Sequence, residues 1–298
     1  MVPEQKALIV NADDFGWSTG VNRGIVEACG KGILTSATAM VNFPAFKDAA
    51  KMATDLPELG VGLHLNIVHG PPISNPSAIP TLVNASGDFP GTEVVLRRLM
   101  LGRVSESDIE LELSNQLELF RSEIGEPTHL DSHKHLHVFG SFLPAFIKIA
   151  GNLRIPRARC PSENIALRPP SPAWIKSLIL SFLGSRAKSV FHNKGVLTPD
   201  HFEGGTDGHR FTADVCRRIV DRLEDGVTEL MCHPGYRSKN DHDVIPDVAV
   251  TKYRERHLRT LLDPSLKAYI LERGINLIHF GKLEHNNQID TSGQNSGY

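Results

Sequence analysis

Apolar runs of strand length alternate with longer amphipathic segments along most of this chain of 298 residues. Ala7–Asn11 is apolar up to Val10, as in a strand buried on both faces, and Val21–Gly30 after it has helical spacing. Further strands are predicted at Ser36–Val41, Val61–Asn66, Thr128–Ser132, Arg157–Cys160, Glu229–Cys232 and Ile275–Phe280. Further helices are predicted at Ala45–Ala53, Ser105–Ile124, Phe142–Ala150, Thr212–Leu223 and Thr251–Arg273. The alternation predicts an α/β fold with a mostly parallel sheet of about seven or eight strands, closed or nearly closed into a (β/α) barrel.

Two segments interrupt this alternation. Gly70–Gly91 is rich in proline, serine and glycine, which predicts a long surface loop. Pro161–Gly208 is also rich in proline and glycine, and we expect an elaborated loop with one helix inside it. The sequence after Leu283 is polar and poor in apolar residues. We therefore expect a single domain over residues 1–283 and a disordered tail over 284–298.

The helix expected inside the second segment has an apolar stripe. Ser171 can cap it, and Pro172 suits its first position. The stripe consists of Trp174, Ile175, Leu178, Ile179, Phe182 and Leu183. The plainer interpretation is a helix packed on the barrel. The alternative is that part of the stripe, Trp174 above all, stays exposed and contacts an apolar substrate group or a membrane surface.

Composition and charge narrow the class of protein. The net charge of −2 gives no electrostatic reason to expect nucleic acid as a partner. No run approaches the ~20 apolar residues of a membrane-spanning helix. The scattered cysteines have no metal-ligand or redox spacing, and no signal peptide is evident, so we expect reduced cysteines and a cytoplasmic location. A symmetric homodimer is the default expectation for assembly.

The candidate acidic and histidine residues lie at the ends of predicted strands. Asp13 and Asp14 follow the first predicted strand, and His64 closes a later one. His133 follows a third strand, and His233 follows a fourth. Because the carboxyl ends of the strands in a parallel barrel share one face, we expect these side chains to surround one cavity.

These residue types suit a divalent metal. Two neutral imidazoles and one carboxylate form a mixed nitrogen and oxygen set that leaves positions open for water and substrate. Each signal alone also has a plainer interpretation, since adjacent aspartates cap turns and single histidines often lie in cores. Their joint position at strand ends favours the metal site, and the two imidazoles favour Zn²⁺ or another transition ion.

Four motifs carry a resemblance to a known family. They are NADDFG (Asn11–Gly16), GLHLN (Gly62–Asn66), HLDSHKHLH (His129–His137) and CHPG (Cys232–Gly235). In this order, over about residues 6 to 280, they resemble the signatures of the YdjC-like carbohydrate deacetylases, which include diacetylchitobiose deacetylases and hopanoid-biosynthesis-associated members. The resemblance implies a YdjC-type barrel-like fold and metal-dependent removal of acetyl from an N-acetylated amino sugar. The sugar would be an N-acetylglucosamine unit of a chito-oligosaccharide or of a glycoconjugate such as a glycosylated hopanoid.

The resemblance also implies roles for individual residues. It makes Asp14, His64 and His133 the ligands of one divalent ion, and it permits Mg²⁺ as well as Zn²⁺. Asp13 is then the general base and His233 the general acid.

Other positions keep two interpretations. His135 and His137 either contact substrate or support their neighbours. Arg159 either has a role in the site, neutralising a carboxylate such as Asp13 or contacting substrate, or forms an ordinary surface ion pair. Asp131 either orients an imidazole or is a solvated or capping carboxylate.

Two other functions stay open. A metal-dependent phosphoesterase or other amidohydrolase is less favoured because no phosphate-cradling glycine loop accompanies the candidate ligands. A non-enzymatic sugar- or metal-binding protein is less favoured because a pure binder needs no general base beside its ligand.

Overall fold

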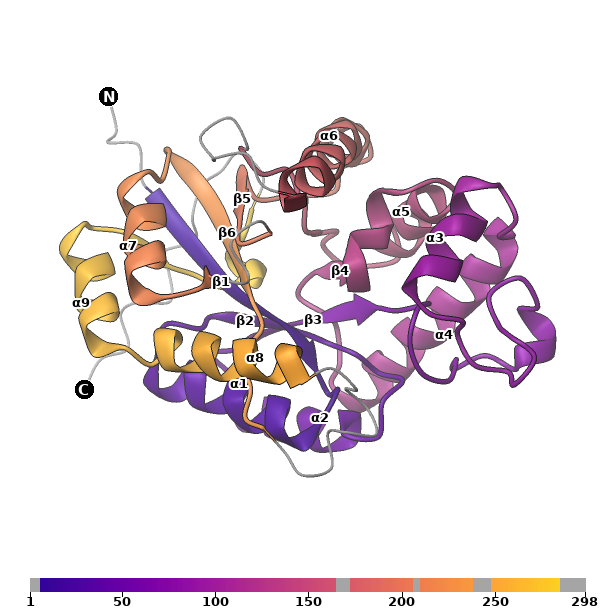
Figure 1. The fold of residues 1–298 in the computed structure, drawn as a ribbon, viewed down its shortest axis with the longest axis horizontal. Helices are drawn as coiled ribbons and strands as arrows, with labels where there is room; N and C mark the ends of the chain where they lie inside the picture. The colour runs from indigo at the N-terminus through magenta and orange to yellow at the C-terminus, as the bar shows by residue number, and fades with distance from the viewer. Residues whose placement is uncertain (1–5, 165–171, 206–209, 238–247, 285–298) are drawn as a thin grey trace.

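The fold is built on one parallel β-sheet (Figure 1). The computed structural model describes residues 6–164, 172–205, 210–237 and 248–284. The strands are β1 (Lys6–Phe15), β2 (Ser36–Ala39), β3 (Gly60–Leu65), β4 (Leu130–Ser132), β5 (His201–Glu203), β6 (Gly226–Cys232) and β7 (Asn276–Leu277). They lie in the order β4-β3-β2-β1-β6-β5, and β7 pairs with the start of β1.

The sheet curls into an incomplete barrel. All strand pairs are parallel, and β1 at the centre is buried along nearly its whole length. Two isolated parallel bridges, Leu130 with Ala158 and Arg157 with Leu197, continue the pairing from β4 toward the segment that leads into β5. The predicted parallel, barrel-like α/β fold is therefore confirmed.

Helices surround the sheet. They are α1 (Thr19–Lys31), α2 (Phe46–Thr54), α3 (Thr92–Met100), α4 (Glu106–Glu123), α5 (Phe142–Ala150), α6 (Pro172–Asn193), α7 (Ala213–Asp221), α8 (Val248–Leu261) and α9 (Pro264–Glu272). In Figure 1, α1, α2 and α8 lie along one side of the sheet, α7 and α9 gather at one end, and α3, α4 and α5 at the other. One large apolar cluster joins residues of the sheet to the inward faces of these helices.

Several elements differ from their predicted form. Arg157–Cys160 forms bridges but no regular strand, because Pro156 and Pro161 flank it and proline has no N–H to donate to a ladder. The helix predicted at Thr251–Arg273 is two helices, since Pro264 starts α9 and the Asp263 side chain accepts a hydrogen bond from the Ser265 N–H.

Among the described α-helices and strands, two were not predicted. The first is α3, whose buried Val95 and Leu99 have the i, i+4 spacing of a helix, so this element could have been predicted. The second, β5, has three residues, too few for an alternating pattern, and forms with α6 inside the predicted loop Pro161–Gly208.

The cysteines are in the state expected for a protein without disulfides. All four cysteines are free, and Cys160, Cys216 and Cys232 are buried. In the part of the chain that the structure describes, no helix is both long and apolar enough to cross a membrane. Residues 285–298 of the predicted tail lie outside the described residues, and the single-domain assignment stays a prediction.

Candidate metal centre

A bulge at the end of β1 brings two neighbouring carboxylates to the same place. The register between β1 and β2 shifts between Ala12 and Phe15, and Asp13 and Asp14 lie in this shift. Asp14 has φ 69°, a left-handed conformation that aspartate tolerates better than most residues. Consecutive side chains of a regular strand point to opposite faces, whereas a bulge redirects them. The bulge therefore lets Asp13 and Asp14 approach the same group of histidines.

The two imidazoles come from the next strands across the sheet. His64 lies in β3, where the register pairs it with Asp131 of β4. His133 begins the 3-10 segment η2 (His133–Val138), which follows β4 directly. Lys134 and His135 in this segment have φ 57° and 56°, so the chain turns sharply away once it has placed His133 beside His64.

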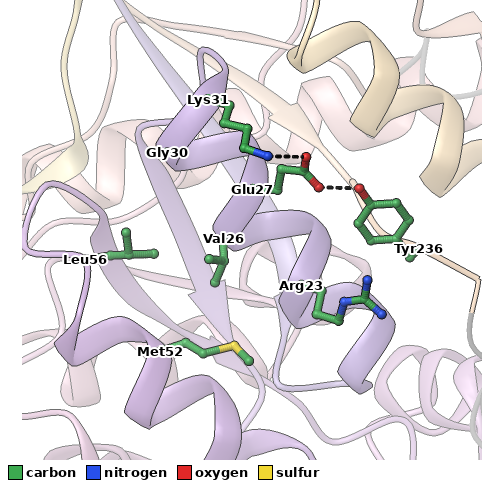
Figure 2. Close-up of a pocket in the computed structure, with 8 residues that line it drawn as sticks. All are labelled: Arg23, Val26, Glu27, Gly30, Lys31, Met52, Leu56 and Tyr236. Atoms are coloured by element: carbon green, nitrogen blue, oxygen red, sulfur yellow. Dashed lines mark hydrogen bonds and ion pairs between the residues drawn. The ribbon is translucent and has the colours of Figure 1, made fainter.

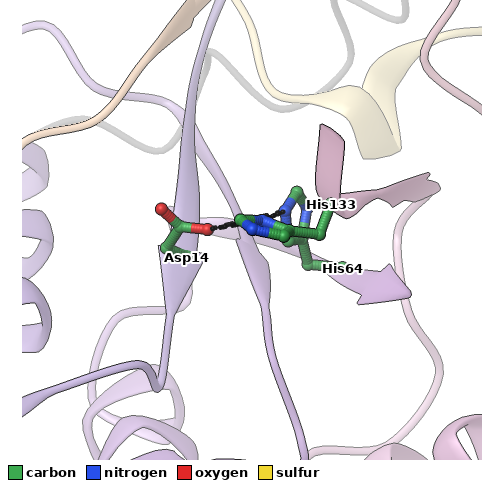
Figure 3. Close-up of side chains that lie close together, drawn as sticks. All are labelled: Asp14, His64 and His133. Atoms are coloured by element: carbon green, nitrogen blue, oxygen red, sulfur yellow. Dashed lines mark hydrogen bonds and ion pairs between the residues drawn. The ribbon is translucent and has the colours of Figure 1, made fainter. Parts of the chain in front are cut away.

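Asp14, His64 and His133 form a compact triangle of donor atoms (Figure 3). Asp14 Oδ1 lies 3.6 Å from His64 Nε2 and 3.3 Å from His133 Nδ1, and the two nitrogens are 3.4 Å apart. Ligands bound tetrahedrally at ~2.1 Å are separated by ~3.4 Å, so the triangle has the size of one face of such a site. Asp14 Oδ1 is buried and forms no hydrogen bond of ordinary geometry. The donor set therefore fits one divalent ion.

The surroundings of the two imidazoles suit a metal cation. Burial lowers the pKa of His133 to about 3, so this ring is neutral and can donate a lone pair. His64 Nδ1 is 2.6 Å from Asp131 Oδ1, which leaves Nε2 directed at Asp14. Burial by itself would lower the pKa of His64, but the Asp131 carboxylate outweighs it and the pKa is raised. The same negative field favours a metal cation at Nε2. Asp131 thus contacts an imidazole, the first of its two interpretations.

Arg254 of α8 holds the other oxygen of Asp14. Its guanidinium donates to Asp14 Oδ2 and lies 5.6 Å above the ring centroid of Trp17. Burial would raise the pKa of Asp14, yet Arg254 and His133 outweigh it and hold the pKa well below its usual range. Because Oδ2 is occupied by Arg254, Oδ1 is the oxygen left for the metal.

A second charge cluster surrounds Arg159. Its guanidinium donates to both oxygens of Asp13, at 2.7 and 2.8 Å, and its Nη1 is 2.7 Å from Asp131 Oδ2. Glu229 of β6 accepts from Arg159 Nε at 2.8 Å. The donor atoms of Asp13, His64 and Asp131 are also close enough to hold an ion. Arg159 already bridges those two carboxylates and would repel a cation there, so we assign the metal to the first triangle.

Asp13 and His233 stand beside this triangle. Burial would raise the pKa of Asp13, but Arg159 outweighs it and lowers the pKa, so Asp13 is a carboxylate. His233 follows β6, and its Nε2 is 3.7 Å from Asp13 Oδ2. Its backbone N–H donates to Nδ1 of the buried His257 at 2.9 Å. The His233 side chain is 34% exposed, whereas those of the three candidate ligands are at most 6% exposed.

Comparison of the sequence with known proteins identifies the family of this chain. The sequence profile of the family described as YdjC-like protein matches residues 7–272. The chain belongs to the YdjC-like family.

Named relatives of this YdjC-like chain extend the match over nearly its full length. A carbohydrate deacetylase of Geobacillus stearothermophilus is 38% identical over 91% of this chain and 96% of its own. A chitooligosaccharide deacetylase of Serratia marcescens is 33% identical over 94% of this chain and 100% of its own. Among solved structures, a protein of Enterococcus faecalis V583 provisionally described as a cellobiose-phosphate cleavage protein has a TM-score of 0.73 at 26% identity, over 93% of this chain and 98% of its own.

Local contacts in the fold explain individual residues of the NADDFG and CHPG motifs. In NADDFG, Asn11 donates to Asp13 at 3.2 Å, and Gly16 has φ +92°. In CHPG, Gly235 approaches α1 so closely that a Cβ on Gly24 would lie 2.6 Å from its Cα. These glycines allow the chain segments around the bulge and around His233 to pack together.

The other predicted site residues have different surroundings. Arg159 is fully buried on Asp13, the first of its two interpretations. His137 is also fully buried, with Nδ1 2.7 Å from Ser132 Oγ and Nε2 3.2 Å from the Arg159 carbonyl. Neither ring nitrogen of His137 is left for a substrate, so we retain it only as a support for Arg159. His135 is half-buried, its Nδ1 has no partner, and it stays a candidate for substrate contact. The Trp174 side chain lies outside the described residues.

Sequence reasoning missed several residues of the centre. Glu229 could have been found, because a carboxylate inside the apolar strand Gly226–Cys232 needs a buried partner. Arg254 lies among other charged residues of α8 and gives no local signal. Trp17 packs edge-on to His133 at 5.2 Å and stacks on Phe43 at 5.1 Å, which forms an aromatic wall beside the candidate ligands.

A separate hollow lies on the outer side of α1 (Figure 2). It has a volume of about 500 Å³ and is lined mainly by residues of α1, together with Met52, Leu56 and Tyr236. Glu27 pairs with Lys31 at 3.1 Å and accepts from the Tyr236 hydroxyl, so these polar groups satisfy one another. None of the predicted site residues lines this hollow.

Proposed function

We propose that this YdjC-like protein is a metal-dependent carbohydrate N-deacetylase that removes acetyl from an N-acetylated amino sugar. The observation that carries the proposal is the buried triangle of Asp14, His64 and His133. A further carboxylate, which is not one of the candidate ligands, lies beside this triangle. That carboxylate, Asp13, is in turn near a partly exposed imidazole, His233. The deacetylase names of the relatives support the substrate class.

The chemistry of amide hydrolysis suits these residues. A bound divalent ion would lower the pKa of a water ligand to ~7 and polarise the acetyl carbonyl. Asp13 would accept the proton of the attacking water, and Arg159 fixes the orientation of its carboxylate. His233 would donate a proton to the departing amine nitrogen. Its partial exposure supports this role, because a group that meets the substrate has to be reachable.

The types of the ligand residues bear on the identity of the metal. Two imidazoles and one carboxylate favour Zn²⁺, with Mg²⁺ as the alternative. The sugar would be an N-acetylglucosamine unit of a chito-oligosaccharide or of a glycoconjugate such as a glycosylated hopanoid. The four free cysteines support a cytoplasmic location. A homodimer stays a proposal that rests only on how common such assemblies are.

The test is acetate release by protein stripped with a strong chelator and then reloaded with Zn²⁺ or Mg²⁺. We expect activity on N-acetyl chito-oligosaccharides to disappear and return, and His64→Ala and His133→Ala to lower metal content and activity together. Phosphate release from phosphoesters, measured in parallel, would favour the phosphoesterase. Sugar binding without acetate release would favour the non-enzymatic binder. Full activity in metal-free protein would contradict the proposal.

The acid role of His233 is tested by the pH profile. An acid loses function as the pH rises through its pKa, and burial lowers the pKa of His233 from its usual value. His233→Ala should therefore reduce kcat and remove the alkaline limb. An unchanged alkaline limb would assign the acid role to another residue, with His135 next.

A further inference from the structure

Helix α6 exposes a row of large apolar side chains. Its inner side contributes Ala187 and Phe191 to the core, with Leu180 and Leu183 packed against it. On its outer side, the exposed fractions are 63% for Ile175, 45% for Leu178, 52% for Ile179 and 61% for Phe182. Their spacing of three, four and seven residues places these four on one face of the helix. We call this row the α6 apolar face.

The α6 apolar face groups more exposed apolar side chains on one element than the rest of the described surface does. The other large exposed apolar residues among those described are single or adjacent positions on other elements: Val94, Met100, Leu101, Leu111, Ile155 and Leu271. Scattered exposed apolar residues are normal in soluble proteins. Four on one face of one helix form a contiguous patch, which indicates a binding surface.

The charged residues of the α6 segment itself are all basic. From Pro172 to Pro199 the sequence contains Lys176, Arg186, Lys188 and Lys194 and no aspartate or glutamate. The whole chain, by contrast, has 34 acidic and 32 basic residues. The Arg186 guanidinium lies 6.0 Å from the ring centroid of Phe182, so a cation adjoins the apolar face directly. An apolar face with a cation beside it, on a helix that has no acidic residue of its own, matches an anionic surface that also has an apolar interior.

We propose that α6 docks this protein on the surface of an anionic lipid bilayer. Ile175, Leu178, Ile179 and Phe182 enter the boundary between headgroups and acyl chains, and Arg186 meets the lipid phosphates. A second copy of the chain fits this face less well, because two α6 helices would bring like charges together. Four side chains are also far fewer than the ~20–30 residues that each partner contributes to a typical stable interface.

Docking through α6 has a consequence for substrate. The helix contacts η2, the segment that contains His133 and His135. A bilayer bound to α6 would therefore lie near the elements that form the candidate metal centre, which favours an acetylated sugar attached to a lipid. This consequence rests on the proposed function, whereas the docking itself does not.

The experiment is co-sedimentation of the full chain with vesicles of phosphatidylcholine alone or mixed with phosphatidylglycerol. We expect binding to the anionic vesicles and at least tenfold weaker binding by the double variant Ile179→Ser, Phe182→Ser, because it removes two large inserted side chains. Arg186→Glu should weaken binding most at low salt. Leu271→Ser on α9, where the side chain is 58% exposed, is the matched control and should bind like the unaltered protein.

Further measurements distinguish bilayer docking from misfolding and from a dimer interface. Melting temperature and acetate release from a soluble chito-oligosaccharide should be unchanged in the α6 variants. Absence of binding to anionic vesicles, or an equal loss in Leu271→Ser, would overturn the proposal. A dimer that dissociates in the double variant, without vesicle binding, would assign the face to a second copy and also overturn it. Failure of the proposed deacetylase function would instead appear as no acetate release from any substrate, with vesicle binding intact.

Discussion

Asp13 and Asp14 are adjacent in sequence, yet their carboxylates have separate partners. Asp14 is shared between Arg254 on one oxygen and the two imidazoles on the other. Asp13 is held by Arg159 on both oxygens and lies outside the ligand triangle. At the scale of single residues, the structure thus separates a candidate metal ligand from a candidate base.

Asparagine at the two positions should therefore have different effects. Asp14→Asn should weaken metal binding, because a neutral amide is a poorer ligand than a carboxylate. Asp13→Asn should keep the metal and lose roughly 10²–10⁴-fold in kcat, the usual contribution of a general base. Metal content by atomic absorption and acetate-release kinetics measure the two effects. Equal loss of metal from both variants would contradict the assignment.

At the scale of elements, the centre depends on segments far apart in the chain. The bulge of β1 supplies the carboxylates, β3 and η2 supply the imidazoles, and α8 supplies Arg254. Arg254 reaches Asp14 across 240 positions of sequence. Helix α8 is therefore part of the metal centre, although it contributes no ligand.

Removal of Arg254 should test this role of α8. In Arg254→Met, Asp14 loses the partner that directs its Oδ1 toward the metal, so metal affinity should fall by ~10–100-fold. The measurement is titration of the stripped protein with Co²⁺, followed by visible absorption. Arg259→Met, an exposed arginine of the same helix, is the control and should bind Co²⁺ normally. Equal affinities in the two variants would show that Arg254 has no positioning role.

At the scale of the whole molecule, the barrel buries more negative than positive charge. Arg159 faces Asp13, Asp131 and Glu229, and all four side chains are at most 5% exposed. Three carboxylates on one guanidinium cannot all be fully compensated. Burial raises the pKa of Glu229 to about 7, although Arg159 opposes the shift.

This shift predicts a pH dependence of stability. Glu229 has an ordinary value of 4.5, so between that value and about 7 the folded chain holds a proton that the unfolded chain releases. The stability contributed by Glu229 therefore decreases as the pH rises through this window. Relative to Glu229→Gln, the unaltered protein should lose on the order of 2 kcal/mol of unfolding free energy between pH 5 and pH 7.5.

Urea unfolding at the two pH values, with chelator present throughout, measures this difference. The chelator keeps the pH dependence of metal binding out of the comparison. A difference between the two proteins that stays constant with pH would mean that Glu229 is ionised throughout this range.

The sequence by itself determined most of the strands of the sheet and what they carry at their ends, although it missed β5 and predicted a regular strand at Arg157–Cys160. Largely apolar runs of strand length predicted β1, β3 and β6, and parallel pairing then placed Asp14, His64, His133 and His233 on one face. The prediction of a single helix over Thr251–Arg273 was wrong, although Asp263 and Pro264 are a local start signal from which the division between α8 and α9 could have been predicted. These features follow from periodicity and local backbone preferences, which neighbouring residues suffice to fix.

Only the tertiary structure decided what each side chain faces. The bulge at Asp13 and Asp14, the partners of Arg159 and Arg254, and the outward direction of the α6 apolar face all depend on residues distant in sequence. A buried guanidinium is stable only beside carboxylates that the fold delivers to it, and no local pattern identifies them. The same holds for α6: its sequence gives an apolar stripe, but packing against the core decides which half of that stripe stays exposed.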